Sequence, residues 1–430
     1  YVRVKTSARK VRRRKAAVLD GTLPPAVKRL VKRVFDECKS WTQKRMQITY
    51  KDAEIVTPLG TLHAEQLQAG QAVLHLLRLQ ILVWDRKLQE ELLQQAWAAT
   101  AVEAHVHDGV LKAALLNRQD EWLDASLPVQ SGMQLINNDG RFQVVAQRNT
   151  PEVAAQAQAD AHAVAKLSNE YLSLIPHKFG HKKKPPVLDT LQAIGKETLL
   201  LQQLEDLNQL LMRDSQALRT KDVKRQYASL ECTMAVVDPE TDEFQAMQAK
   251  VAPHKLKRLF RVRKESEHQA FRKDPHHTPL LFHGSRMHNW LGLLSKGLLL
   301  PKQVEATGVA LTDGGWLGRG LYFGDADTAA KYASAGGGKT AFILAAEVAM
   351  GRVYQTRKQD YTLMEAPAGF DSVHGVKDAE GAGIIHRLTG LLREKSHFDD
   401  DEYVIYRTEQ QRMTHLLEIE GKTGNYASNA

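Results

Sequence analysis

The first half of the chain repeats its hydrophobic residues at steps of three and four, the spacing of one helix face. A first helix begins at the Pro24-Pro25 pair, where missing N–H groups do no harm. A second helix, dense in leucine, runs to about Trp97, and its density predicts burial on several sides. Pro151 opens an alanine-rich helix, and a further helix carries leucines between 188 and 211. We therefore expect residues 22–213 to form mainly a helical bundle.

Residues 88–150 interrupt this helical pattern. The run Asn137–Gly140 is typical of a turn, and Phe142, Val144 and Val145 follow it. This combination predicts a small hairpin or an irregular insertion within the helical region.

After Arg213 the pattern changes from helical spacing to short β-prone runs separated by turns. Residues 214–226 are polar and charged, as in a linker. The later runs predict an α+β domain over residues 227–420, and the small, polar residues 421–430 form a tail. The β-prone runs are Met234–Val237, Leu280–Phe282, Phe342–Ala349, Tyr403–Tyr406 and His415–Ile419.

Charge and composition narrow the class of protein. The net charge is +9, and Tyr1–Lys15 alone carries eight Lys or Arg residues with no acid. Within residues 1–21 this block fits either a nucleic-acid contact or import signal, or a solvated linker, and both interpretations stay open. The two cysteines, Cys38 and Cys232, exclude a disulfide framework and favour a reducing compartment inside the cell. No apolar run reaches the roughly 18 residues of a membrane span. Because Tyr1 is not Met and no signal-peptide pattern follows, we expect a fragment of a longer chain.

Three short segments in the second half could hold one dinucleotide. Phe282–Ser285 puts a histidine and a glycine at a strand end, where backbone can approach a ligand closely. Gly318–Phe323 puts a tyrosine where its ring could stack on a nicotinamide. Asp399–Tyr406 sends Glu402 toward one face of a strand, and a carboxylate in a cleft needs a task or a partner. Each segment alone also fits a structural role, and Asp399–Asp401 fits a solvated acidic turn.

The order and spacing of the three segments resemble the His-Tyr-Glu signature of the poly(ADP-ribose) polymerases. Leu23-Pro24, Pro58–Gly60 and the long run Leu167–Gly180 resemble the helical regulatory domain of that family. The resemblance implies a multidomain protein: an all-α helical regulatory bundle at 22–213, with the insertion at 88–150, then an α+β ADP-ribosyltransferase domain at 227–420. The catalytic part is most similar to that of the vault poly(ADP-ribose) polymerase, notably in Gly297–Lys302 and Glu365–Val376.

By this resemblance, His283, Tyr322 and Glu402 are the catalytic residues. His283 binds a ribose hydroxyl, Tyr322 stacks on nicotinamide, and Glu402 holds the nicotinamide ribose and polarises the attacking hydroxyl. Tyr332 is the second stacking ring, while Ala329 stands where the family usually has a serine for the carboxamide. The resemblance also implies NAD-binding roles for Gly284, Ser285, Arg286 and Asn289. Thr328 or Ser334 could substitute for the missing serine. Asp206 is expected to face the NAD cleft, and Gln303–Leu317 is expected to form a loop over the donor site.

The implied activity is transfer of ADP-ribose from NAD to proteins, including the enzyme itself, and to growing ADP-ribose chains. NAD is then a substrate, and no metal is required. The helical domain is expected to be autoinhibitory and to be relieved by DNA, bound through a region upstream of Tyr1 or through the basic segment. Single transfer, or NAD binding without turnover, are the alternatives.

Other nucleotide and metal sites fit less well. Ala333–Thr340 matches a relaxed phosphate-binding loop, but a helical pattern precedes it and a strand follows it, the reverse of the required order. Gly318, Gly320 and Gly324 lack the spacing of a dehydrogenase fingerprint. The histidines at 276, 277, 283 and 288 lack the cysteines and the helix of a zinc site.

Overall fold

The computed structural model describes residues 22–51, 53–58, 60–148, 150–177, 185–274, 277–300, 315–334, 339–360, 363–378 and 396–420. Residues 1–21 and 421–430, named above as a basic segment and a tail, lie outside this range. Contacts divide the chain into two compact units, one of residues 63–201 and 308–312 and one of the remainder. The first is called here the helical unit and the second the catalytic unit. None of the described helices is long and apolar enough to cross a membrane.

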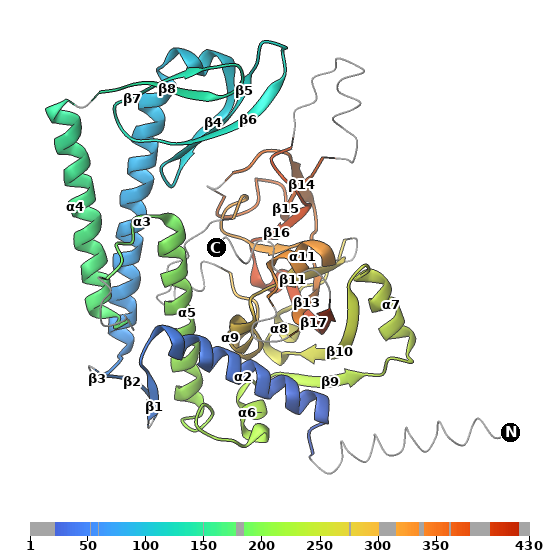
Figure 1. Ribbon diagram of the computed structural model, residues 1–430. Helices are drawn as coiled ribbons and strands as arrows, with labels where there is room; N and C mark the ends of the chain where they lie inside the picture. The colour runs from blue at the N-terminus through green and yellow to red at the C-terminus, as the bar shows by residue number, and fades with distance from the viewer. Residues whose placement is uncertain are drawn as a thin grey trace. The chain divides into compact units, whose positions relative to one another are not determined.

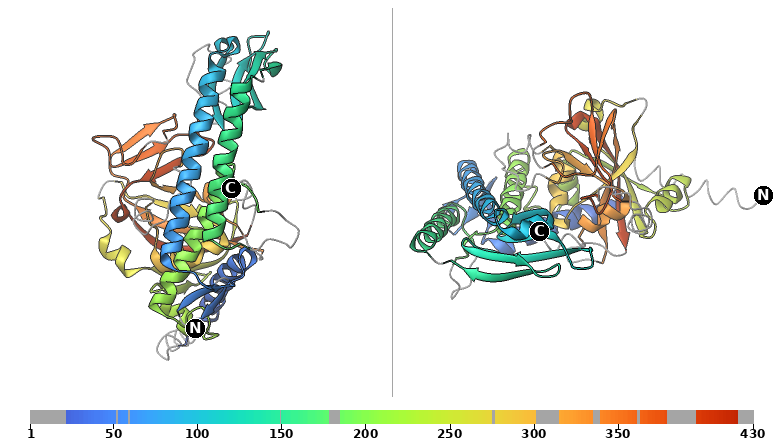
Figure 2. Two further views of the ribbon diagram at one scale, coloured as in Figure 1. Left: turned by 90° about the vertical axis from the view of Figure 1, so that its left-hand side faces the viewer. Right: turned by 90° about the horizontal axis from the view of Figure 1, so that it is seen from above.

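The helical unit is built on two long helices, α3 (Ala64–Leu93) and α4 (Pro151–Leu174), which run side by side (Figures 1 and 2). The first turns of α5 (Leu191–Arg213) also belong to it. At Gly70 of α3, the side chains of Ile175 and Leu201 come so close that an added Cβ would lie 3.0 Å from Ile175. The predicted helices at 151–174 and 191–213 are thus confirmed.

The expectation that the leucine-dense helix is buried on several sides is wrong. One stripe of α3 is buried, including Leu67, Leu77 and Leu88. Leu76 and Val83 are 51% and 49% exposed, on the other side of the helix. The many leucines of α3 therefore indicate helix propensity as much as burial, because leucine is a strong helix former at any position.

The regulatory part is not purely helical, in contrast to the all-α expectation. Between α3 and α4, a 3₁₀ turn η1 (Ala96–Thr100) leads into β4 (Ala101–His107), β5 (Val110–Leu116) and β6 (Trp122–Pro128), an antiparallel sheet. The hairpin of β7 (Met133–Asn137) and β8 (Phe142–Gln147) follows, with the predicted Asn137–Gly140 turn between its strands. The insertion therefore has its own core, in which Trp97, Leu111 and Leu115 pack on Leu88 and Leu92 of α3.

Carboxylates of α3 fasten this insertion to the helix. Asp85, only 4% exposed, accepts hydrogen bonds from the backbone N–H groups of Asp108 and Gly109 at 2.8 and 2.9 Å, in the β4–β5 turn. Glu91 accepts hydrogen bonds from Ser131 Oγ and from the Gly132 N–H at 2.7 and 2.6 Å. These charge-assisted bonds fix two turns of the insertion against one helix face.

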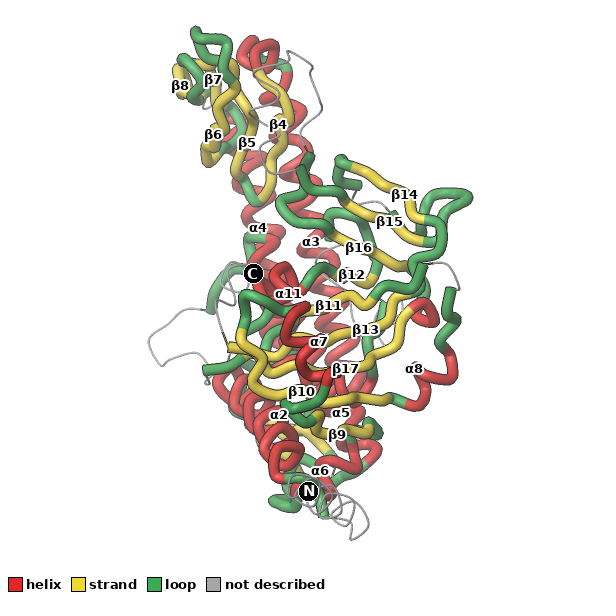
Figure 3. Tube along the Cα trace, turned by 90° about the vertical axis from the view of Figure 1, so that its right-hand side faces the viewer, coloured by secondary structure: helices red, strands yellow, loops and turns green. Residues whose placement is uncertain are grey.

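The catalytic unit contains a five-stranded antiparallel sheet in the order β11-β13-β17-β10-β9 (Figure 3). Its second sheet has the order β12-β16-β15-β14 and is antiparallel except between β14 and β15. The predicted α+β character and the predicted strands are confirmed. The strands are β9 (Thr233–Val237), β10 (Lys255–Arg263), β11 (Leu280–Gly284), β12 (Leu321–Phe323), β13 (Ala341–Val348), β14 (Val353–Thr356), β15 (Ser372–Gly375), β16 (Glu402–Ile405) and β17 (Gln411–Glu420).

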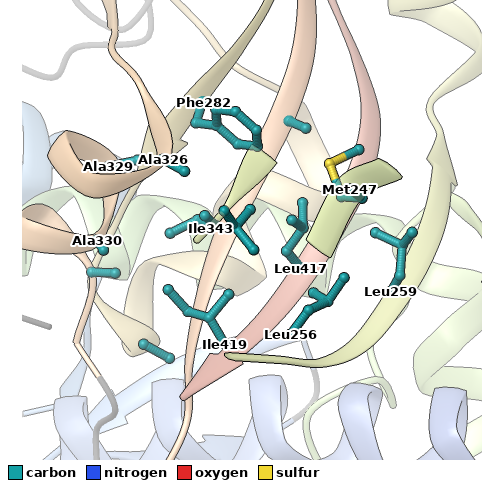
Figure 4. Packing of buried hydrophobic residues seen from close by; sticks show 14 of the residues in the cluster. Met247, Leu256, Leu259, Phe282, Ala326, Ala329, Ala330, Ile343, Leu417 and Ile419 are labelled. Carbon is teal, nitrogen blue, oxygen red and sulfur yellow. The ribbon is translucent and has the colours of Figure 1, made fainter. Parts of the chain in front are cut away.

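Strand β13 is buried on both faces, as its continuous apolar run predicts. Ile343 and Ala345 join the core formed with α7 (Asp242–Lys250) and α11 (Ala326–Tyr332) (Figure 4). On the opposite face, the Phe342 ring meets the edge of Trp290 in α9 (Trp290–Lys296) at 6.2 Å. Short helices thus cover both faces of the larger sheet. Apart from α2 and the end of α5, the other helices among the described residues of this unit are α6 (Val223–Ser229), α8 (Glu265–Ala270) and the 3₁₀ turns η2 (Met287–Asn289) and η3 (Thr408–Gln410).

Helix α2 (Pro25–Arg45) belongs to the catalytic unit by its contacts, together with the small sheet β1 (Thr49–Lys51), β2 (Glu54–Thr57) and β3 (Gly60–Thr61). The helix buries the predicted face, since Val27, Val31 and Phe35 are all 0% exposed. On its other side, Arg33 donates to Thr340 Oγ1 and to the Thr340 carbonyl at 2.8 and 2.6 Å.

Asp85→Ala should destabilise the insertion. The change leaves two partly buried N–H groups without an acceptor, at a cost of up to about 1–3 kcal/mol each. We expect a lower urea midpoint and faster hydrogen exchange in residues 101–128. Glu90→Ala on the same helix is the control, because its 3.1 Å pair with Arg86 is exposed and contributes little. Equal exchange rates in both variants would show that Asp85 does not hold the turn.

Candidate active site

His283 lies at the end of β11, with its ring nitrogens in different environments. Nδ1 is 3.0 Å from the carbonyl oxygen of Tyr322, so Nδ1 carries the proton and donates it. Burial lowers the pKa of His283, which keeps the ring neutral. Nε2 then has a free lone pair, and the described residues provide no donor to it. A neutral histidine held in this tautomer can accept a hydrogen bond from a sugar hydroxyl.

Tyr322, in β12, is fixed by its own hydroxyl group. The hydroxyl donates to the Gly318 carbonyl at 2.8 Å and accepts from the Leu317 N–H at 2.9 Å. Gly315 touches the ring so closely that an added Cβ would lie 2.3 Å from Cζ. Since both hydrogen-bonding roles of the hydroxyl are used by backbone, Tyr322 offers a substrate its ring rather than its oxygen.

Glu402 begins β16 and is largely buried. Its Oε2 atom is buried and has no hydrogen-bond partner among the described residues. Burial, and secondly the charge of Asp400, raise the pKa of Glu402 to about 7. An orphaned buried carboxylate oxygen is rare in proteins and marks a site where a ligand hydroxyl can bind.

Strand pairing brings these three residues together from distant parts of the chain. Phe282 and Gly324 exchange two backbone hydrogen bonds of 2.9 Å, which joins β11 of one sheet to the end of β12 in the other. Tyr322 in turn pairs with Val404 of β16, two residues from Glu402. Burial raises the pKa of Tyr322, and the negative charge of Glu402 adds to that rise. The sequence-predicted trio therefore shares one region at the junction of the two sheets.

Comparison with known proteins agrees with this geometry. Residues 241–421 match the model of the poly(ADP-ribose) polymerase catalytic domain, and residues 130–229 match that of the poly(ADP-ribose) polymerase regulatory domain. The chain thus contains a catalytic and a regulatory domain of the poly(ADP-ribose) polymerase family type.

Relatives within the family carry two kinds of name. Protein mono-ADP-ribosyltransferase PARP4 of Mus musculus is 34% identical over 269 residues, which are 59% of this chain and 12% of the mouse protein. Poly [ADP-ribose] polymerase 2 of Homo sapiens is 30% identical over 305 residues, 63% of this chain and 50% of the human protein. Poly [ADP-ribose] polymerase 1 of Danio rerio is 30% identical over 296 residues, 61% of this chain and 28% of that protein. The chain thus spans half or less of the length of these relatives.

Tyr332, expected by resemblance to be the second stacking ring, ends α11 and is 45% exposed. Ala329, where the family usually has serine, is buried in the core of the catalytic unit. Its carbonyl oxygen lies so close to Gly284 that an added Cβ would be 1.7 Å away. Gly284 is therefore required by the packing of α11 on β11. Of the two expected substitutes, Ser334 already accepts the Met287 N–H at 3.1 Å, and Thr328 is buried against Gly324.

Ser285, expected to contact ribose, and Asn289, expected near the adenosine half, are joined by a hydrogen bond. Ser285 Oγ accepts a hydrogen bond from Asn289 Nδ2 at 2.9 Å, and Asn289 Oδ1 accepts one from Gln203 of α5 at 3.0 Å. Burial, and then the nearby charge of Arg45, lower the pKa of Arg286. Both Ser285 and Asn289 are thus oriented by neighbours before any ligand binds.

Asp206 makes a contact that its sequence position did not reveal. Its carboxylate is 6% exposed, lies against Gly292 and forms a 2.7 Å ion pair with Lys296, both on α9. Burial raises the pKa of Asp206, while Lys296 opposes that rise.

The loop expected over the donor site lies mostly in residues 301–314, and the glycine run 336–338 of the phosphate-loop alternative is also outside the described residues.

Sequence reasoning missed two residues beside Glu402, because it assigned Asp399–Asp401 to a solvated turn. Lys331 binds both carboxylate oxygens of Asp400 at 2.6 and 2.5 Å. His374 lies 2.9 Å from Asp401, so the two side chains are hydrogen-bonded. Both acids thus have basic partners from other elements. Those partners are far away in sequence, so no local pattern could have shown the pairing.

Glu402→Gln should make the protein more stable relative to wild type as the pH rises. A carboxyl whose folded pKa of about 7 exceeds its ordinary value of 4.5 stabilises the fold when protonated, and that contribution is lost as pH rises through 7. The difference corresponds to roughly 3 kcal/mol between pH 4.5 and 8. Denaturant unfolding across this range measures it, with Glu409→Gln as control. If the difference in unfolding free energy between variant and wild type does not change with pH, Glu402 does not have the raised pKa of a buried carboxyl.

Proposed function

We propose that this chain transfers ADP-ribose from NAD to proteins, itself included, and extends the product into poly(ADP-ribose). The observation that carries the proposal is the buried, unpartnered Oε2 of Glu402 in the same region as the free Nε2 of His283 and the ring of Tyr322. NAD is the substrate, and its ribose hydroxyls are the groups that these two acceptors would bind. Among the described residues no cluster of His, Cys, Asp and Glu could hold a metal ion.

In the proposed reaction, the bond between ribose C1′ and nicotinamide nitrogen breaks, and nicotinamide leaves with the electron pair. Positive charge develops on the ribose, and the acceptor's nucleophile forms the new bond to C1′ on losing its proton. Tyr322 and Tyr332 would hold the nicotinamide by stacking, Ser285 would contact ribose, and Arg286 and Asn289 would hold the adenosine half. His283 and Glu402 would hold the ribose. The carboxylate of Glu402 lies beside the developing cation, where fixed negative charge is most effective.

Single transfer is the second candidate, because the mouse relative described above is named a mono-ADP-ribosyltransferase. Polymer growth requires that a ribose hydroxyl of the previous unit be activated as nucleophile. A carboxylate with a pKa of about 7 is suited to accept that hydroxyl's hydrogen bond near neutral pH. For this reason extension is the primary proposal.

Automodification with labelled NAD distinguishes polymer extension from single transfer. Wild type should give a high-molecular-weight smear, and Glu402→Gln should reduce it to a faint single band, with NAD consumption lower by about 10²-fold. His283→Ala should lower consumption similarly, whereas His162→Ala, on an exposed position of α4, should not. A single band from wild type would establish single transfer. No labelling, with NAD still bound, would leave a binding protein and contradict the proposal.

We further propose that α2 and the end of α5 restrain the donor site. Trp41 of α2 stacks on His288 with ring centroids 4.2 Å apart, and Arg45 covers Trp41 at 4.4 Å. His288 is adjacent to Asn289, which the helix α5 contacts through Gln203. Both helices therefore touch η2, the turn that follows the Ser285–Arg286 segment of the donor site.

Trp41→Ala should loosen this contact and raise basal NAD turnover by roughly fivefold, a typical coupling between sites. Trp122→Ala is the matched control, since Trp122 is 49% exposed on the insertion. Turnover should be measured with and without nicked DNA, because the basic segment 1–15 is proposed as a DNA contact. A fall in turnover on Trp41→Ala would mean that α2 supports the donor site and does not restrain it.

A further inference from the structure

Helix α11 packs against strand β11 and the end of β12, which carry part of the proposed donor site. Its Ala329 carbonyl rests on Gly284 of β11, and its Thr328 side chain rests on Gly324, which follows β12. Its last residue is Tyr332. Two of the three strands are thus fixed to α11 by glycines that allow very close approach. The third strand, β16, carries Glu402.

Lys331 links α11 to β16. Its Nζ binds both oxygens of Asp400, at 2.6 and 2.5 Å, and lies 4.0 Å from Asp327 of its own helix. The two partner side chains are 26% and 14% exposed, so the pair is shielded from water. Lys331 precedes Tyr332 directly, and Asp400 is two residues before Glu402. The pair therefore connects the stacking ring to the catalytic acid.

Several charged or titratable groups surround Glu402. Asp400 and Asp401 precede it in the chain, Tyr322 of β12 interacts electrostatically with both Glu402 and Tyr332, and Lys331 of α11 binds Asp400. Asp401 is engaged on the other side, by His374 of β15 at 2.9 Å and Lys377 at 3.9 Å. Asp400 is the acid whose charge acts on Glu402. Lys331 is consequently the cation that can offset this charge.

We propose that Lys331 and Asp400 form a positioning pair for the transfer reaction, setting where Tyr332 stands relative to Glu402 and how much negative charge reaches Glu402. The inference rests on the proposed function of Glu402 and Tyr332. Neither member of the pair touches the reacting atoms. Both act through the residues next to them, one on the nicotinamide side and one on the acid side.

The pair predicts shifts of opposite sign in the pH dependence of NAD consumption. Turnover that needs ionised Glu402 rises with pH through its pKa of about 7. Lys331→Met leaves the charge of Asp400 uncompensated and should move this rise upward by about one pH unit. Asp400→Asn removes the charge and should move it downward by a similar amount. The double variant should lie between the two, and Lys331→Arg should stay close to wild type.

The KM for NAD is a second measurement, and it separates the effect of the pair on the position of Tyr332 from its effect on the charge near Glu402. Lys331→Met frees the end of α11, so the KM for NAD should rise severalfold, while Lys331→Arg should largely retain it. Lys257→Met is the matched control, because Lys257 makes a 2.7 Å ion pair with Glu420 on β17, outside the site. Shifts of the same sign in Lys331→Met and Asp400→Asn, or a lower melting temperature with unchanged pH profile and KM, would overturn the proposal.

Binding of nicotinamide, measured by calorimetry, keeps this test independent of turnover. If wild type does not cleave NAD, the proposed function fails. The positioning pair is then judged by nicotinamide affinity alone, which should fall severalfold in Lys331→Met and not in Lys257→Met. Equal affinity in these two variants would overturn the pair whether or not the protein is active.

Discussion

The donor site depends on one backbone contact, the pair of hydrogen bonds between Phe282 and Gly324. These two bonds join a five-stranded sheet to a four-stranded one at the point where both sheets end. His283 follows on one side of this junction and Tyr322 precedes it on the other. Glu402 reaches the same place through the pairing of β16 with β12. Because the junction uses main-chain groups, side chains around it are left available for a ligand.

Close packing of small residues holds the surroundings of this junction. Gly284 admits the carbonyl of Ala329, Gly292 admits the carboxylate of Asp206, and Gly320 admits the side chain of Val404. An added methyl group would overlap its neighbour at each position. These glycines serve close approach between elements, which is a packing requirement of the catalytic unit. The many glycines around the site thus serve close packing between its elements as much as the approach of a ligand.

Electrostatics near Glu402 work against stability. A buried carboxylate with an unpartnered oxygen beside a second acid is unfavourable when ionised, and its raised pKa expresses that cost. The neighbouring acids instead have partners: Asp400 pairs with Lys331, and Asp401 pairs with His374 and Lys377. A buried carboxylate that is left without a partner while its neighbours are paired is typical of functional sites. Its unfavourable state in the free protein favours the binding of a ligand.

The sequence alone determined most of the local elements and predicted His283, Tyr322 and Glu402 as a trio. Helical spacing, apolar runs and the ordered motifs around His283, Tyr322 and Glu402 are carried by neighbouring residues, and each agrees with the element that formed. Only the tertiary structure decided which face of α3 is buried, that the insertion is a carboxylate-fastened sheet, and that Ala329 is core. It also decided that Lys331 meets Asp400, 69 residues away. These outcomes depend on which distant surfaces meet, and a local pattern holds no information about that.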